Sequence, residues 1–170
     1  MPRISEKEAG SKNALAWLDM IGWSEGTSTS PHTKDDGYDI LVTGSPASAY
    51  PRSILDYSKH PNILVTVNKK KGLKSTAFGR YQFLYGTWME GVKRYGFKGR
   101  IIPEAQDLMA LKKTAERGAL EDVHAGRFAE AIRKCNKEWA SFHGSPYGQR
   151  THSLASMLAE LHVRGATVVA

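Results

Sequence analysis

A change of pattern along the chain limits the folds that it can adopt. After about residue 83, apolar side chains recur at the three- and four-residue spacings of helices. Residues 26–82 instead contain many turn formers, which interrupt two short β-type runs, Tyr38 to Val42 and Ile63 to Val67. One more helix is expected ahead of this segment, over Ser11 to Ser24. The order predicts an α+β protein with a small β lobe, a mainly helical lobe and a cleft between them for a polymeric substrate.

Four helices are predicted in the second half, each from an apolar stripe at helical spacing. They are a helix with Met89, Val92 and Tyr95 that ends at Gly96, one from Pro103 to Gly118, one over Phe128 to Trp139, and one from about Leu154 to Gly165. Between the two β-type runs, Thr43 to Asn62 carries three prolines and is long for a connection without secondary structure. We therefore expect a functional loop there, at the edge of the cleft.

Length and composition fit one ordinary globular domain. The 170 residues are 41% hydrophobic and 24% charged, which excludes a disordered chain. No stretch approaches the roughly 18 to 20 apolar residues that span a bilayer. The segment from Met1 to Gly10 lacks the apolar core of a signal peptide. We therefore expect the chain to be made and folded in the cytoplasm, without stable insertion in a membrane.

Cysteine and histidine indicate neither a disulfide nor a metal site. Cys135 is the only cysteine, so no disulfide can form within the chain, and its place on the apolar face of a predicted helix favours a buried structural thiol. The six histidines, at positions 32, 60, 124, 143, 152 and 162, show no spacing of metal ligands. No metal and no cofactor are expected.

The net charge of +7 indicates a polyanionic partner, because a positive field raises the rate of encounter with negative targets. The clearest basic cluster is Lys69, Lys70, Lys71 and Lys74. Nucleic acid and an anionic bacterial wall both match this charge. A basic nucleic-acid-binding domain is kept as an alternative, although the chain contains no recognisable reader motif.

Glu25 occupies a position where a negative charge is costly. It follows Ile21 by four residues and Leu18 by seven, so it continues the stripe that the first helix buries, and Gly26 then ends the helix. Burial and the helix macrodipole both oppose a negative charge there, so we expect a raised pKa and a general-acid role. A capping or salt-bridged glutamate at a frayed helix end is the alternative.

A second group of residues has the chemistry of a sugar site. Gly79 allows close backbone approach to a ligand, Tyr81 offers a ring for stacking, and Gln82 offers an amide that both donates and accepts hydrogen bonds. Trp17 and Trp23 flank Glu25 with flat apolar surface of the kind that lines sugar clefts. A structural turn explains the Gly-Arg-Tyr-Gln segment equally well.

Several segments together closely resemble the bacteriophage lambda endolysin family, in one consistent order from about residue 13 to residue 165. They are Leu18 to Thr27, Gly37 to Asp39, Leu73 to Thr76, Gly79 to Gln82, Glu116 to Leu120, Trp139 to Ser141 and Tyr147 to Gln149. The resemblance implies a lysozyme-like α+β fold in a single domain over residues 1–170, with a catalytic helix at about 11–25, a β lobe at about 26–82 and a helical lobe at about 83–165. It also implies a lytic transglycosylase that cleaves the bond between N-acetylmuramic acid and N-acetylglucosamine in peptidoglycan.

The resemblance places the catalytic glutamate on Glu25, and it places two mobile lips of the cleft on Val65 to Lys74 and His143 to Arg150. The residues expected to bind the substrate are Tyr38, Asp39, Ser75, Gly79, Tyr81, Gln82, Tyr147 and Gln149. For Asp39, a role in ordering the β lobe through a turn or cap is the alternative. The chain departs from the family in carrying Phe78 beside Gly79 and in a longer Thr43 to Asn62 segment, which affects the details of the sugar subsites.

Two mechanisms remain open on these residues. In a transglycosylase, the 6-hydroxyl of the sugar replaces water, so that Glu25 suffices as the only acid and a 1,6-anhydromuramoyl product forms. In a hydrolytic muramidase, one of Asp35, Asp36 or Asp39 serves as the second carboxylate. The resemblance further implies a monomer whose partner is the glycan strand of peptidoglycan. It would accumulate in the host cytoplasm and reach the periplasm through a separate membrane-permeabilising protein of the holin type.

Overall fold

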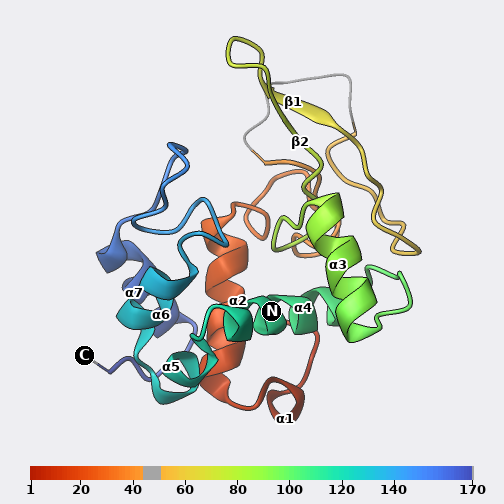
Figure 1. The fold of residues 1–170 in the computed structure, drawn as a ribbon. Coiled ribbons are helices and arrows are strands. Elements are labelled where there is room, and N and C mark those ends of the chain that lie inside the picture. The colour runs from red at the N-terminus through yellow and green to blue at the C-terminus, as the bar shows by residue number, and fades with distance from the viewer. Residues whose placement is uncertain (44–50, 170) are drawn as a thin grey trace. The chain divides into compact units, whose positions relative to one another are not determined.

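The computed structural model describes residues 1–43 and 51–169, and within these it has an α+β architecture of helices and one two-stranded sheet (Figure 1). The elements are α1 (Glu6–Ala9), α2 (Lys12–Ser24), β1 (Val65–Asn68), β2 (Leu73–Ser75), α3 (Tyr85–Tyr95), α4 (Pro103–Glu116), α5 (Leu120–Ala125), α6 (Phe128–Cys135) and α7 (Leu154–Val163). No helix in the described ranges is long and apolar enough to cross a membrane. Part of the segment predicted as a functional loop, residues 44–50, lies outside the described residues.

The chain divides into two compact units. We call Met1–Ser24 together with Asp107–Ala170 the helical unit, and Glu25–Gln106 the hairpin unit. One border falls between Ser24 and Glu25, at the end of α2, and the other falls inside α4. This division differs from the expected lobe boundary near residue 82, because α3 belongs to the same unit as the hairpin.

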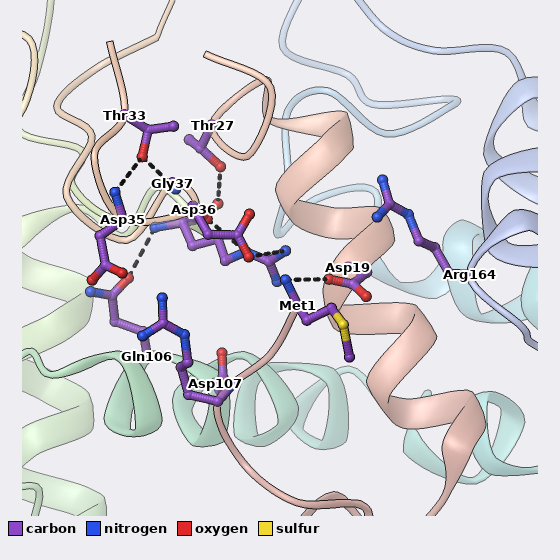
Figure 2. Close-up of polar contacts among 12 residues, drawn as sticks. Met1, Asp19, Thr27, Thr33, Asp35, Asp36, Gly37, Gln106, Asp107 and Arg164 are labelled. Atoms are coloured by element: carbon purple, nitrogen blue, oxygen red, sulfur yellow. Dashed lines mark hydrogen bonds and ion pairs between the residues drawn. The ribbon is translucent and has the colours of Figure 1, made fainter. Parts of the chain in front are cut away.

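Helix α2 forms the centre of the helical unit, where it packs against α1, α5 and α7. Of the apolar stripe predicted for this helix, Ala14, Leu18 and Ile21 are buried and Leu15 is half-buried. Residues on the other faces, including Asp19 and Met20, are buried as well. A helix buried on most sides belongs to a core, whereas a surface helix buries a single stripe. The amino group of Met1 lies 3.6 Å from a carboxylate oxygen of Asp19, which supplies a positive charge to this buried acid (Figure 2).

Trp17 is part of this core. Its ring is fully buried, stacks on Phe128 at a centroid distance of 6.2 Å and meets Phe142 edge-on at 5.6 Å. Its indole nitrogen donates a hydrogen bond to the hydroxyl of Thr114 at 3.0 Å. The prediction that Trp17 offers a flat surface to a sugar is therefore wrong, since the ring is fully buried and its polar edge is hydrogen-bonded inside the protein.

Most predicted helix ends are confirmed, while two details of the helices differ. Helix α6 ends at Cys135, four residues before the predicted end. Helix α3 buries Trp88 and Gly91, whereas Met89 of the predicted stripe is 40% exposed. Cys135 is buried as predicted, and burial raises the pKa of its thiol to about 12.

The sheet of the hairpin unit is an antiparallel hairpin of β1 and β2, in which Val65 pairs with Ser75 and Asn68 with Leu73 (Figure 1). The second predicted β-type run is thus largely confirmed as β1. The first run, Tyr38 to Val42, lies outside this sheet and forms isolated bridges, from Ile40 to Ser53 and from Leu41 to Phe78.

Gly79 occupies a position that other residues fill poorly. Its φ of +85° is left-handed, and a Cβ there would collide with the side-chain amide of Gln106. That amide accepts a hydrogen bond from the backbone N–H of Arg80 at 2.9 Å and donates to the carbonyls of Tyr38 and Ile101 at 3.1 and 2.9 Å. The close approach at Gly79 is therefore to the protein's own Gln106.

We predict that Gly79→Ala lowers the free energy of unfolding by about 3 kcal/mol, because backbone strain adds to the loss of Gln106 hydrogen bonds. Gly118→Ala is the matched control, since Gly118 also has a positive φ, of +68°, but a Cβ at that position would meet nothing within 4 Å. There the strain alone costs about 1 kcal/mol. Urea unfolding measures the free energy of unfolding of both variants. Equal decreases in the two variants would contradict the role of Gln106.

His60 is a buried histidine in the hairpin unit. Its Nε2 donates a hydrogen bond to the carbonyl of Phe83 at 2.8 Å, and its Nδ1 accepts one from the backbone N–H of Asn62 at 3.0 Å. These contacts match the neutral ring. Burial lowers the pKa of His60 below its ordinary value, while the hydrogen bond to Phe83 opposes this shift.

We predict that His60 makes the protein less stable as the pH falls. The unfolded chain binds a proton at His60 below about pH 6.5 while the folded chain does not, so the free energy of unfolding falls by up to about 1.4 kcal/mol per pH unit down to the folded pKa. Urea unfolding should be measured between pH 7.5 and pH 5, which is roughly the range in which histidine titrates. The free energy of unfolding should depend less on pH in His60→Gln than in the wild type. The same change at His162, exposed on α7, is the control and should keep the wild-type slope.

Candidate active site

Glu25 directly follows the last residue of α2 and is half-buried. The helix therefore ends where the sequence predicted, and Gly26 continues the turn with a left-handed φ of +72°. The last carbonyls of an α-helix have no partner within the helix and carry its negative dipole end. Glu25 thus begins at the negative end of the α2 dipole.

Side chains of the helical unit hold the residue before Glu25. The hydroxyl of Ser24 lies 2.7 Å from that of Ser141, and Nε2 of His152 donates a hydrogen bond to the Ser24 carbonyl at 3.0 Å. The ring of His152 also lies against Trp23, with centroids 4.2 Å apart. The end of α2 is consequently fixed by two hydrogen bonds and one ring contact.

Contacts of the hairpin unit hold the residues after Glu25. The hydroxyl of Thr27, which is fully buried, donates a hydrogen bond to the carbonyl of Arg80 at 2.6 Å. Gly37, at a φ of +88°, lies so close to this segment that a Cβ would come within 2.8 Å of the backbone of Thr27 and Ser28. The turn that begins at Glu25 is therefore packed against two separate parts of its unit.

Asp39 is fully buried, and the contacts of its carboxylate are local. The carboxylate accepts hydrogen bonds from the hydroxyl of Thr33 at 2.5 Å and from the N–H of Lys34 at 2.9 Å. The same hydroxyl accepts from the N–H groups of Asp35 and Gly37, at 3.2 and 2.7 Å (Figure 2). This geometry favours the ordering role of Asp39 over contact with a substrate.

Arg80 is a structural residue of the hairpin unit that the sequence pattern did not single out, although it lies inside the Gly-Arg-Tyr-Gln segment. Its side chain is 1% exposed, with Nε donating to the carbonyl of Asp36 at 3.0 Å and one terminal nitrogen 3.6 Å from the Asp36 carboxylate. The guanidinium lies over the rings of Tyr38 and Tyr81, at 5.4 and 5.8 Å from their centroids. Both rings are fully buried, which favours a role in supporting Arg80 over stacking on a sugar.

Gln82 and Ser75 also make contacts within the hairpin unit. The amide oxygen of Gln82 accepts from the N–H of Thr43 at 3.0 Å, and its amide nitrogen donates to the carbonyls of Leu41 and Gly79 at 3.3 and 3.1 Å. The hydroxyl of Ser75, on β2, accepts from the N–H of the residue two positions later. Substrate contact by either residue stays a prediction.

Tyr147 and Gln149 belong to the helical unit and are exposed. They lie in the predicted lip between α6 and α7, where Gly144 and Gly148 adopt positive φ angles of +77° and +69°. The hydroxyl of Tyr147 donates to the carbonyl of Lys137 at 2.7 Å, while its side chain remains 56% exposed. Of the predicted sugar contacts, these two have the most accessible side chains.

The three aspartates considered as a second catalytic carboxylate all have structural partners. Asp39 binds the Thr33 turn, Asp36 pairs with Arg80, and Asp35 accepts a hydrogen bond from the hydroxyl of Tyr57 at 2.6 Å. Across residues 1–43 and 51–169, no group of three or more histidine, cysteine, aspartate or glutamate side chains is arranged to hold a metal ion.

Comparisons with known proteins agree with this architecture. A family model described as Endolysin matches residues 15–168. The endolysin of Escherichia phage P2 is 42% identical over 157 residues, covering 91% of this chain and 93% of that protein. The endolysin of Escherichia phage lambda is 42% identical over 154 residues, covering 90% of this chain and 91% of its own length.

Solved structures show the same fold. Bacteriophage lambda lysozyme in complex with a chitohexasaccharide superposes with a TM-score of 0.84 and 38% identity, over 99% of this chain and 100% of that chain. A second structure of lysozyme from bacteriophage lambda gives a TM-score of 0.80 and 36% identity over the same shares of both chains. The predicted lysozyme-like α+β fold is thereby confirmed.

Proposed function

Because the chain belongs to the endolysin family, we propose that it cleaves the bond between N-acetylmuramic acid and N-acetylglucosamine as a lytic transglycosylase, with Glu25 as its acid. As a phage endolysin of lysozyme type, it is an enzyme that breaks down the host cell wall. The observation that carries the finer proposal is the position of Glu25, half-buried at the end of α2, in a chain segment held on both sides.

The position of Glu25 suits a proton donor. Glu25 is half-buried at the negative end of the α2 dipole, and both features generally oppose a negative charge, which suits a group that donates a proton. General acid and base catalysis contributes about 10² to 10⁴-fold to a rate when the group is held in reach of the reacting atom. The hydrogen bonds at Ser24 and Thr27 limit how far the backbone around Glu25 can move.

The partners of the three nearby aspartates support a mechanism with one acid. Asp35, Asp36 and Asp39 each stabilise the hairpin unit through a hydrogen bond or ion pair, and Asp39 is buried besides. A hydrolytic glycosidase of the common kind needs a second carboxylate to activate water or to attack the sugar. A transglycosylase does not, because the nucleophile is the substrate's own 6-hydroxyl.

In the proposed reaction, Glu25 transfers its proton to the glycosidic oxygen as the bond from that oxygen to C1 of the muramoyl sugar breaks. The oxygen leaves as a hydroxyl group on the departing sugar. The 6-hydroxyl of the muramoyl residue then attacks C1, and the Glu25 carboxylate accepts its proton. The product is a 1,6-anhydromuramoyl end, and Glu25 returns to its acid form without any water being consumed.

The partner of this site is a glycan strand, since a relative of the same fold binds a chitohexasaccharide. Peptidoglycan also carries carboxylates on its peptides, which suits a chain of net charge +7 with Lys69, Lys70, Lys71 and Lys74 exposed around the hairpin turn. We propose that the enzyme acts as a monomer on the wall in the periplasm and that a separate membrane-permeabilising protein gives it access.

We predict that digestion of purified peptidoglycan releases muropeptides with 1,6-anhydro ends, each lighter by one water than the reducing-end form. Mass spectrometry of the soluble products measures this. The Glu25→Gln variant is the matched control, and because it cannot give up a proton it should lose at least about 10²-fold in the rate of release while remaining folded.

Reducing ends in place of anhydro ends would show hydrolysis and favour the muramidase with a second carboxylate. Near-wild-type release by Glu25→Gln would overturn the assignment of the acid.

We predict that Asp39→Asn mainly affects stability. The amide can replace only part of the carboxylate's acceptor capacity toward Thr33 and Lys34, so the free energy of unfolding should fall by about 1–2 kcal/mol. The rate of wall digestion per folded molecule, measured well below the unfolding temperature, should remain within about threefold of the wild type, since no transition-state contact is lost. Loss of activity in a fully folded Asp39→Asn would instead identify Asp39 as a catalytic carboxylate.

A further inference from the structure

Two residues far away in sequence meet at the last residue of α2. Ser141 lies after α6 and His152 lies before α7, and the backbone N–H of His152 donates to the carbonyl of Ser141 at 2.9 Å. Both side chains then reach Ser24, the hydroxyl of Ser141 at 2.7 Å and Nε2 of His152 at 3.0 Å. We call these three residues the Ser24 node.

The Ser24 node fixes a specific peptide plane. A carbonyl oxygen only accepts, so Nε2 of His152 carries the hydrogen in this contact. The carbonyl of Ser24 belongs to the peptide that joins Ser24 to Glu25, and it is one of the terminal helix carbonyls that have no partner inside α2. A donor held on that oxygen therefore limits rotation of this peptide plane, which places the N and Cα atoms from which the side chain of Glu25 extends.

The surroundings of the node make it rigid. Ser24 is 5% exposed, and the ring of His152 is held against Trp23 with centroids 4.2 Å apart. The hydrogen bond between Ser141 and His152 also closes the base of the loop that carries Tyr147 and Gln149. The same two residues thus join the base of this exposed loop to the end of α2.

We infer that His152 and Ser141 are positioning residues, which hold the carboxyl group of Glu25 in its working orientation by fixing the peptide between Ser24 and Glu25. The inference rests on the proposed role of Glu25 as the acid. If the acid is displaced by a fraction of an ångström, the enzyme still binds its substrate, but proton transfer becomes slower. Loss of the node should therefore lower kcat and leave KM nearly unchanged.

Two variants of His152 separate the hydrogen bond from the ring contact. His152→Phe keeps a flat ring against Trp23 and removes the donor, while His152→Gln removes the ring and offers an amide donor to the Ser24 carbonyl. With a soluble peptidoglycan fragment as substrate, His152→Phe should lower kcat by about tenfold with KM within about twofold of the wild type. His152→Gln should recover most of the lost kcat.

His162→Phe is the matched control. Because His162 is exposed on α7, this substitution should leave kcat and KM unchanged. Ser141→Ala tests the node without touching the histidine, and it should lower kcat in the same direction, which keeps the inference testable if His152→Phe folds poorly. Circular dichroism and thermal unfolding confirm that each variant is folded at the assay temperature.

A His152→Phe or Ser141→Ala variant that is folded and has wild-type kcat would overturn the inference. An equal loss of kcat in His152→Phe and His152→Gln would also overturn it, because packing would then explain the loss. A change confined to KM would overturn it too, because His152 would then contact the substrate. These results are separate from a failure of the proposed function, which would appear as full activity in Glu25→Gln.

Discussion

The burial of the Arg80 guanidinium is the constraint on which the hairpin unit depends. A buried cation is costly unless its charge is offset and its N–H groups find acceptors. Asp36 meets this need with a carbonyl and a carboxylate, and Tyr38 and Tyr81 add ring faces to the guanidinium. Because the carbonyl of Arg80 also accepts a hydrogen bond from the hydroxyl of Thr27, the arginine is linked to the chain segment that follows Glu25.

This arrangement explains why many residues with the chemistry of a sugar site turn out to be internal. Tyr38, Asp39, Tyr81 and Gln82 carry groups that bind hydroxyl and acetamido groups well, and the same groups serve a loop-rich unit with little regular hydrogen bonding. A long segment with two short strands must satisfy its backbone N–H and C=O groups through side chains. Residue type alone therefore does not separate a ligand contact from an internal one.

The sequence predicted those features of the fold that depend on local periodicity and on helix stops. Helix α2, its end at Ser24 and the positions of α3, α4 and α7 follow from apolar spacing and from glycine or proline at the ends. Helix α1 was missed because four residues are too short for a period to show. The strand that pairs with β1, Leu73 to Ser75, was not predicted, because a β-type run does not specify which segment it pairs with.

The candidate site was predicted in the same uneven way. Glu25 could be proposed as the acid from the sequence because its spacing from Leu18 and Ile21 along one helix is a local property. The contacts of Ser24 come from residues 117 and 128 positions away, and no local pattern indicates which distant side chains will meet there. Tertiary packing thus decides how the chain around Glu25 is held, whereas the end of the helix decides where Glu25 begins.

The buried thiol of Cys135 bears on how the chain responds to oxidising surroundings. A thiol with a pKa of about 12 is almost entirely protonated near neutral pH, and only the thiolate attacks disulfides or reacts readily with oxidants. Burial withholds it from partners as well. A chain folded under reducing conditions and then released into an oxidising space would keep the same covalent structure, and would need no thiol chemistry to begin work.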